Sequence, residues 1–118
     1  MVSLRALTLG LLALPAALAA DCYGSGNAGF SVTEYQQTAA QVCNYGPSAS
    51  LVFGDTGFPN YYRRVVEASY TGTEKLHCWD AFNNIIAQCV QGSGRNGGQW
   101  TWDYGSDHEK YYIQSYYG

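Results

Sequence analysis

The sequence predicts an α+β fold: a two-layer sandwich in which a small antiparallel or mixed sheet carries two helices on one face and is held by two disulfides. Three observations predict it. Strand and helix patterns alternate along residues 20–118, all four cysteines lie in that part of the chain, and so do the eleven Tyr, four Phe and three Trp. Because aliphatic residues are scarce there, we expect a core built largely from aromatic rings.

The first nineteen residues have the composition of a secretory signal. Arg5 precedes an apolar run over 6–17, and Ala17-Leu18-Ala19 supplies the small residues of a cleavage site. Cleavage there leaves residues 20–118 as one secreted domain with no membrane-spanning segment. Five Lys and Arg remain against nine Asp and Glu. This acidic balance argues against nucleic-acid binding, which needs clustered cations.

Two helices are expected. The first covers residues 31–43, because Ser31 and Glu34 form a capping box and apolar residues then recur at helical spacing. The second begins at Cys78 and ends before Gly92, a residue suited to a helix C-terminus. It has the strongest apolar periodicity in the chain, carried by Cys78, Phe82, Ile85, Ile86, Cys89 and Val90.

The strands are expected around the helices. A short edge strand is predicted at 51–53, and a longer strand at 61–70 whose alternation gives it a covered face of Tyr62, Arg64, Val66, Ala68 and Tyr70. A final hairpin pairs 99–104 with 110–116. One face of its first strand carries Trp100, Trp102 and Tyr104, and the pattern leaves open whether these rings face the helices or the solvent.

The four cysteines are expected to form two disulfides, because a secreted chain folds in an oxidising compartment and no zinc-type spacing occurs. Cys78 and Cys89 lie about 16 Å apart along one helix at ~1.5 Å per residue, so they cannot bond each other. Two pairings remain. We expect Cys22–Cys78 with Cys43–Cys89, since two parallel helices would bring their starts together and their ends together.

The chain offers few candidates for acid–base catalysis, and these are its histidines. His77 is expected at the surface, on the polar side of the second helix. His108 lies in Asp107-His108-Glu109, a trio that could bind a metal or relay a proton but that usually forms a solvated turn. No serine-hydrolase motif or phosphate loop occurs, so we expect no catalysis, no metal and no cofactor. The alternative is a small secreted hydrolase or ribonuclease-like enzyme that uses His108 with Asp107 or Glu109.

Aromatic residues occupy both faces of at least two predicted strands. Two helices cannot cover all of these rings, so some of them should be exposed. Exposed rings with a polar tip suit contacts to sugars or proteins. We therefore predict a binding patch made of Tyr61, Arg63, Tyr112, Tyr116 and the turn at His108.

Several segments resemble small secreted cysteine-rich proteins of filamentous fungi, and among them the killer-toxin-like group. They are Asp21-Cys22-Tyr23-Gly24-Ser25-Gly26, the helix ending in Cys43, and residues 64–70, 78–89 and 98–104. The resemblance implies a split strand–helix–strand sandwich and a role as toxin, antifungal or effector. The chain departs from the group in its four cysteines, fewer than toxin members tend to have, and in its acidic charge.

A second resemblance covers Cys22 to Cys43 and Phe58-Pro59-Asn60-Tyr61-Tyr62, which are similar to the first half of secreted fungal guanine-specific ribonucleases and their inactive relatives. Asn60 stands where those nucleases have a His. This likeness therefore implies a ribonuclease-like fold without the nuclease activity.

These features predict a secreted, monomeric protein that binds a host or competitor protein, or a cell-wall glycan, outside the cell. An enzyme is the rival class. A purely structural protein is the third class, and it would have no binding partner.

Overall fold

The computed structural model describes residues 19–26, 29–55 and 62–118, so all of the predicted secretory signal except Ala19 lies outside the described residues. The elements follow in the order β1 (Asp21–Tyr23), α2 (Val32–Asn44), β2 (Ser48–Asp55), β3 (Arg63–Gly72), α3 (Cys78–Ile85), η1 (Ile86–Gly92), β4 (Gly97–Tyr104) and β5 (Asp107–Tyr117).

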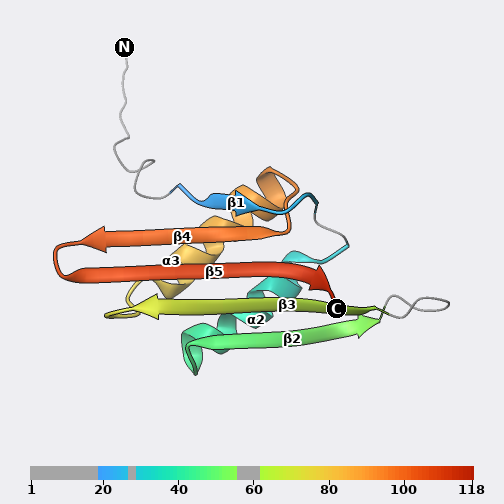
Figure 1. The fold of residues 1–118 in the computed structure, drawn as a ribbon, viewed down its shortest axis with the longest axis horizontal. Helices are drawn as coiled ribbons and strands as arrows, with labels where there is room; N and C mark the ends of the chain where they lie inside the picture. Colours follow the sequence, from blue (N-terminus) through green and yellow to red (C-terminus); the bar gives the residue numbers. More distant parts are fainter. Residues whose placement is uncertain (1–18, 27–28, 56–61) are drawn as a thin grey trace, which may run out of the picture.

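The five strands form one antiparallel sheet in the order β1-β4-β5-β3-β2. Both helices lie on the same side of this sheet, behind it in Figure 1, and the opposite side is uncovered. The predicted two-layer α+β fold with two disulfides is therefore confirmed, and the sheet is antiparallel rather than mixed.

The first helix, α2, begins where its capping box predicts. The backbone N–H of Glu34 donates to the Ser31 hydroxyl at 3.2 Å, and the N–H of Ser31 donates to Glu34 Oε1 at 2.9 Å. The same carboxylate accepts from the Arg64 guanidinium of β3 at 2.8 Å. This ion pair fixes the start of α2 to the sheet, and the helix buries Tyr35, Thr38, Ala39 and Val42 against it.

The second helix is α-helical only in its first half. From Ile86 to Gly92 it widens into the π-helix η1, in which each hydrogen bond spans one residue more than in an α-helix. The wider turn shifts the direction of the side chains that follow. Cys78, at the start of α3, bonds to Cys43 of α2, and Cys89, within η1, bonds to Cys22 of β1.

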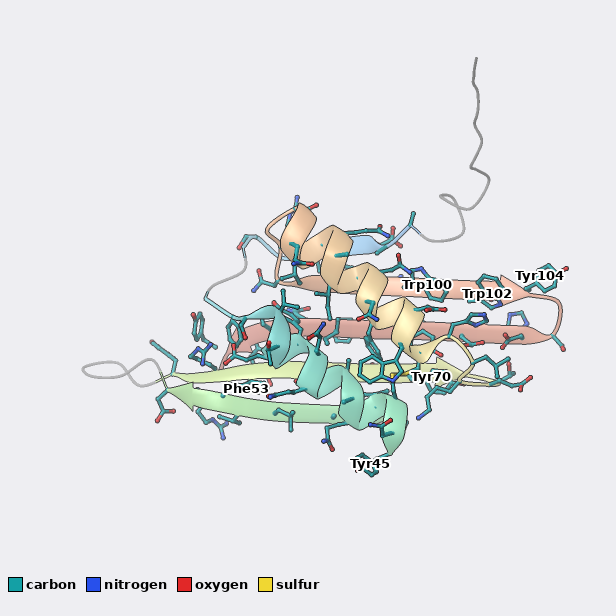
Figure 2. All side chains as sticks on the ribbon, turned by 180° about the vertical axis from the view of Figure 1, so that it is seen from behind. Tyr45, Phe53, Tyr70, Trp100, Trp102 and Tyr104 are labelled. Atoms are coloured by element: carbon teal, nitrogen blue, oxygen red, sulfur yellow. A yellow bond between two sulfur atoms is a disulfide. The ribbon has the colours of Figure 1, made fainter. Side chains whose placement is uncertain are left out.

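The predicted disulfide pairing is wrong. The bonds join Cys22 to Cys89 and Cys43 to Cys78, with Cα–Cα distances of 5.1 and 5.6 Å. The reason is the direction of the helices. The hairpin of β2 and β3 returns the chain to the end of the sheet where α2 stopped, so α3 starts beside the end of α2 and runs antiparallel to it, as Figure 2 shows.

The core is built from rings, as predicted. The largest fully buried side chains are those of Trp100, Tyr35, Tyr111 and Phe82, followed by Ile85 and Ile113. Tyr111 packs edge-on against Phe82 of α3 at 5.4 Å between ring centroids. The predicted covered face of β3 is confirmed at Val66, Ala68 and Tyr70, which are buried or pack against the core. It is wrong at Tyr62, which precedes β3 and is 53% exposed.

The three aromatic residues of β4 share the helix side of the sheet, but their exposure rises along the strand. Trp100 is 1% exposed, Trp102 is half-buried and Tyr104 is 77% exposed. Figure 2 shows why: the row of rings runs out past the start of α3 toward the β4–β5 turn. The core therefore ends at Trp100, and Trp102 forms its edge.

Candidate functional site

The uncovered side of the sheet carries three tyrosines with polar residues between them. Strand alternation places Tyr23 of β1 and Tyr112 and Tyr116 of β5 on this side, which we call the open face. The rings of Tyr23 and Tyr112 lie 5.9 Å apart. The Tyr23 hydroxyl donates to Gln99 of β4. The open face is thus an aromatic surface whose hydroxyl groups are already oriented.

Tyr112 stands between two shallow hollows. One, of about 460 Å³, lies over β2 and β3 and is lined by Ser48, Ala49, Ser50, Glu67, Ala68, Ser69 and Tyr112. The other, of about 240 Å³, is lined by Ser69, Thr71, Gln99, Lys110 and Tyr112. Ser69 and Tyr112 therefore belong to both hollows. Both floors carry small hydroxyl groups, and charged or amide groups lie beside them.

The hydroxyl of Tyr112 is held by its neighbours on the same face. It lies 3.1 Å from Glu67 Oε2 and 2.7 Å from Gln114 Oε1, both hydrogen-bond acceptors. Burial, together with the hydrogen bond to Glu67, raises the pKa of Tyr112 to about 12. The two acceptors, from β3 and β5, therefore position the Tyr112 hydroxyl on the open face.

The structure does not bring all residues of the predicted binding patch together. Tyr112 and Tyr116 are four positions apart along β5 on the open face, and Arg63 lies on the same face near the end of β5. His108 also belongs to this face but lies at the β4–β5 turn, about 34 Å from Arg63 at ~3.4 Å per residue along the strands. Tyr61 lies outside the described residues.

His108 does not join the carboxylates beside it in the sequence. Because successive residues of a strand point to opposite faces, Asp107 and Glu109 turn to the helix side while His108 turns to the open face. There its Nδ1 lies 2.6 Å from Asp103 Oδ1, and both side chains are about 60% exposed. The predicted trio of Asp107, His108 and Glu109 is therefore not a structural unit.

Asp107 and Glu109 instead meet His77, which immediately precedes α3. Potential ligand atoms of the three side chains all lie within 4.8 Å of one another. His77 is not a surface residue on the polar side of the helix, as the sequence predicted: its side chain is 26% exposed, and its ring packs on Trp102 with centroids 4.3 Å apart. We call these three residues the His77 cluster.

Glu109 is the buried centre of this cluster, at 1% exposed. Its Oε1 accepts from the His77 backbone N–H at 2.9 Å and from the Tyr111 hydroxyl at 2.6 Å, and its Oε2 lies 2.9 Å from His77 Nδ1. Burial alone raises the pKa of Glu109, but the hydrogen bonds from Tyr111, Asp107 and His77 outweigh it and lower the pKa to about 2. The hydrogen bond shared with Glu109 raises the pKa of Asp107.

The sequence predicts only part of the His77 cluster. Period-two alternation in β5 already groups residues 107 and 109 and separates 108 from them. No local pattern places His77 beside these two residues. It reaches Glu109 because β3 pairs with β5 up to Gly72 and the chain then turns back over the sheet into α3.

Comparisons with protein-family models, with curated proteins and with solved structures find no match to this chain. Among the described residues, no helix is long and apolar enough to cross a membrane.

Proposed function

We propose that residues 20–118 form a secreted protein that binds a neutral glycan outside the cell through its open face, without catalysis. The leader-like first nineteen residues and the two disulfides support secretion. The backbone N–H of Ala20, the first residue after the predicted cleavage site, donates to Gln88 Oε1 at 2.9 Å, so that residue already takes part in the fold.

One observation carries the proposal: a fixed tyrosine ring stands between two hollows lined by hydroxyl, amide and charged groups. A sugar ring has an apolar face that packs on an aromatic ring, and hydroxyl groups at its rim that need hydrogen-bond partners. Tyrosine and serine supply both kinds of contact with little entropy to lose. The arrangement around Tyr112 and Ser69 matches that requirement.

The charges of the open face favour a neutral ligand. Among its described residues, acidic and basic side chains are mixed: Asp21, Asp55, Glu67 and Asp103 lie on the same face as Arg63 and Lys110. Binding of a phosphate-rich polymer needs clustered cations. Nucleic acids and highly charged polysaccharides are therefore disfavoured as ligands.

The killer-toxin-like resemblance would make the ligand a cell-surface component of a host or competitor. A protein on such a surface is the second candidate, because exposed tyrosines among serines also suit protein recognition. Tyr116 at 37% exposed and Val52 at 52% would enlarge the contact area beyond the two hollows.

The test is binding of the secreted protein to an array of neutral oligosaccharides, followed by calorimetry on each hit. Tyr112→Ala removes the ring, and Ser69→Trp fills both hollows. We expect either change to weaken binding at least about 10-fold, the loss typical of a residue that anchors an interface. Tyr104→Ala, on the opposite side of the sheet, is the matched control and should leave binding unchanged.

Two results would count against the proposal. Glycan binding that survives both Tyr112→Ala and Ser69→Trp would remove the open face as the site. A protein partner captured by the wild type and lost with the same two variants, without any glycan hit, would favour the protein-binding alternative.

A further inference from the structure

We propose that His77, Asp107 and Glu109 form a binding site for a divalent metal ion, with Zn²⁺ as the best-suited ion. The site is independent of the open face, because it lies on the helix side of the sheet. It departs from the prediction that the chain binds no metal.

The first argument for a metal site is the chemistry of its three side chains. One imidazole nitrogen and two carboxylates are ligands that zinc uses in proteins, where three protein ligands with one open position are typical of non-structural sites. The residues come from two segments, the turn before α3 and the start of β5, so they surround a point instead of lining one surface.

The distances suit a small ion. His77 Nδ1 and Glu109 Oε2 lie 2.9 Å apart, close to the ~3.3 Å that separates neighbouring ligands around zinc when each bond is about 2.0–2.1 Å long. The remaining ligand atoms lie within 4.8 Å. Asp107, at the partly exposed start of β5, supplies the third ligand.

Electrostatics supply a reason for a cation at this point. The ligand atoms of Asp107 and Glu109 lie within 4.8 Å of each other, so two carboxyl groups face the same point beside His77. Among the described residues, neither carboxyl forms an ion pair with a lysine or an arginine. A divalent cation between these oxygens would balance the negative charges of both carboxylates.

The groups behind the ligands hold them in place, as metal sites require. The Tyr111 hydroxyl and the His77 backbone N–H both donate to Glu109 Oε1, which leaves Oε2 facing the imidazole. The Trp102 ring packs on His77 and fixes its plane. With the metal on Nδ1, the imidazole carries its remaining hydrogen on Nε2.

The site has an open side. The His77 side chain is 26% exposed and Asp107 is also partly exposed, whereas Glu109 closes the bottom. A metal here would keep at least one coordination position for water or for an oxygen atom of a ligand. The proposal therefore describes an accessible site and not a closed structural zinc.

The experiment is calorimetric titration of the chelator-treated secreted protein with ZnCl₂, with Co²⁺ as a second probe. We expect one ion per chain. Co²⁺ should also quench tryptophan fluorescence, because Trp102 lies against His77. His77→Gln and Asp107→Asn should each weaken zinc binding by at least 10-fold, roughly the loss expected for a missing contact to the ion or to its shell.

The matched control is His108→Gln, which removes the other histidine of a His–Asp pair on the opposite face. This variant should bind zinc like the wild type. Thermal unfolding of all variants without metal separates lost binding from lost folding, and Asp107→Asn keeps the side-chain shape if His77→Gln unfolds. Absence of binding at millimolar zinc, or loss of binding in His108→Gln alone, would overturn the proposal.

Discussion

The disulfide pairing makes a prediction that two pairs of substitutions can decide. Cys22→Ala with Cys89→Ala removes one bond and leaves the other intact. Cys22→Ala with Cys78→Ala removes one partner from each bond, which leaves Cys43 and Cys89 as free thiols. These two sulfurs cannot form a new bond, because Cys43 lies beside Cys78, about 16 Å along the helix from Cys89.

The expected losses of stability follow from the loops that the bonds close. In the chain-entropy model, the 67-residue separation of Cys22 and Cys89 corresponds to about 4.4 kcal/mol and the 35-residue separation of Cys43 and Cys78 to about 3.8 kcal/mol. The first variant should lose about 4 kcal/mol. The crossed variant should lose about 8 kcal/mol, within the range of the whole stability of a typical domain, and should be largely unfolded at 37 °C.

Guanidinium unfolding followed by tryptophan fluorescence measures the loss, and thiol titration in denaturant counts the free cysteines. The first variant should show no free thiol and the crossed variant two. The reverse result, two free thiols after Cys22→Ala with Cys89→Ala and none after Cys22→Ala with Cys78→Ala, would refute the pairing and the antiparallel arrangement of the helices that explains it.

Three further predictions concern single residues. The folded-state pKa of Glu109 lies near 2, against an ordinary value of 4.5. The ionised Glu109 therefore stabilises the fold fully above about pH 4.5, and this stabilisation is lost as the pH falls toward 2. The loss is at most about 3 kcal/mol, and the opposite pKa shift of Asp107 reduces it. Acid unfolding of Glu109→Gln should show a weaker pH dependence than the wild type, and an equal dependence would contradict this. Gly98→Ala would bring a Cβ within 2.3 Å of a backbone oxygen of β1 and should cost about 1–3 kcal/mol in thermal unfolding, whereas Gly26→Ala meets no atom within 4 Å and should be neutral. Ser31→Ala removes the helix cap and should cost about 1 kcal/mol by the same measurement; no change would mean that the cap is redundant.

The parts of the fold that could be predicted are those set by local chemistry. The Ser31–Glu34 capping box marks the start of α2 within one residue, and alternation in β3 gives the correct covered face. Helix direction was not predictable in the same way, because it depends on which end of the sheet the β2–β3 hairpin returns to. That error carried directly into the cysteine pairing.

The candidate site could also be predicted only where local patterns determine it. Alternation within β5 puts Tyr112 and Tyr116 on one face, and the structure agrees. The His77 cluster needed a contact between residues 32 positions apart, which no local pattern records. The exposure of Tyr104 was also beyond the sequence, because it depends on where α3 begins relative to the end of the β4–β5 hairpin.

Both disulfides join the first half of the chain to the second, Cys22 and Cys43 on one side and Cys78 and Cys89 on the other. A protease that cuts the backbone once, anywhere between residues 44 and 77, would therefore leave two fragments that are still linked covalently at both ends of the second helix. The pairing of β1 with β4 would also hold the two fragments together. When the protein is treated with a protease, a single cut in that interval would therefore change the gel pattern only after reduction.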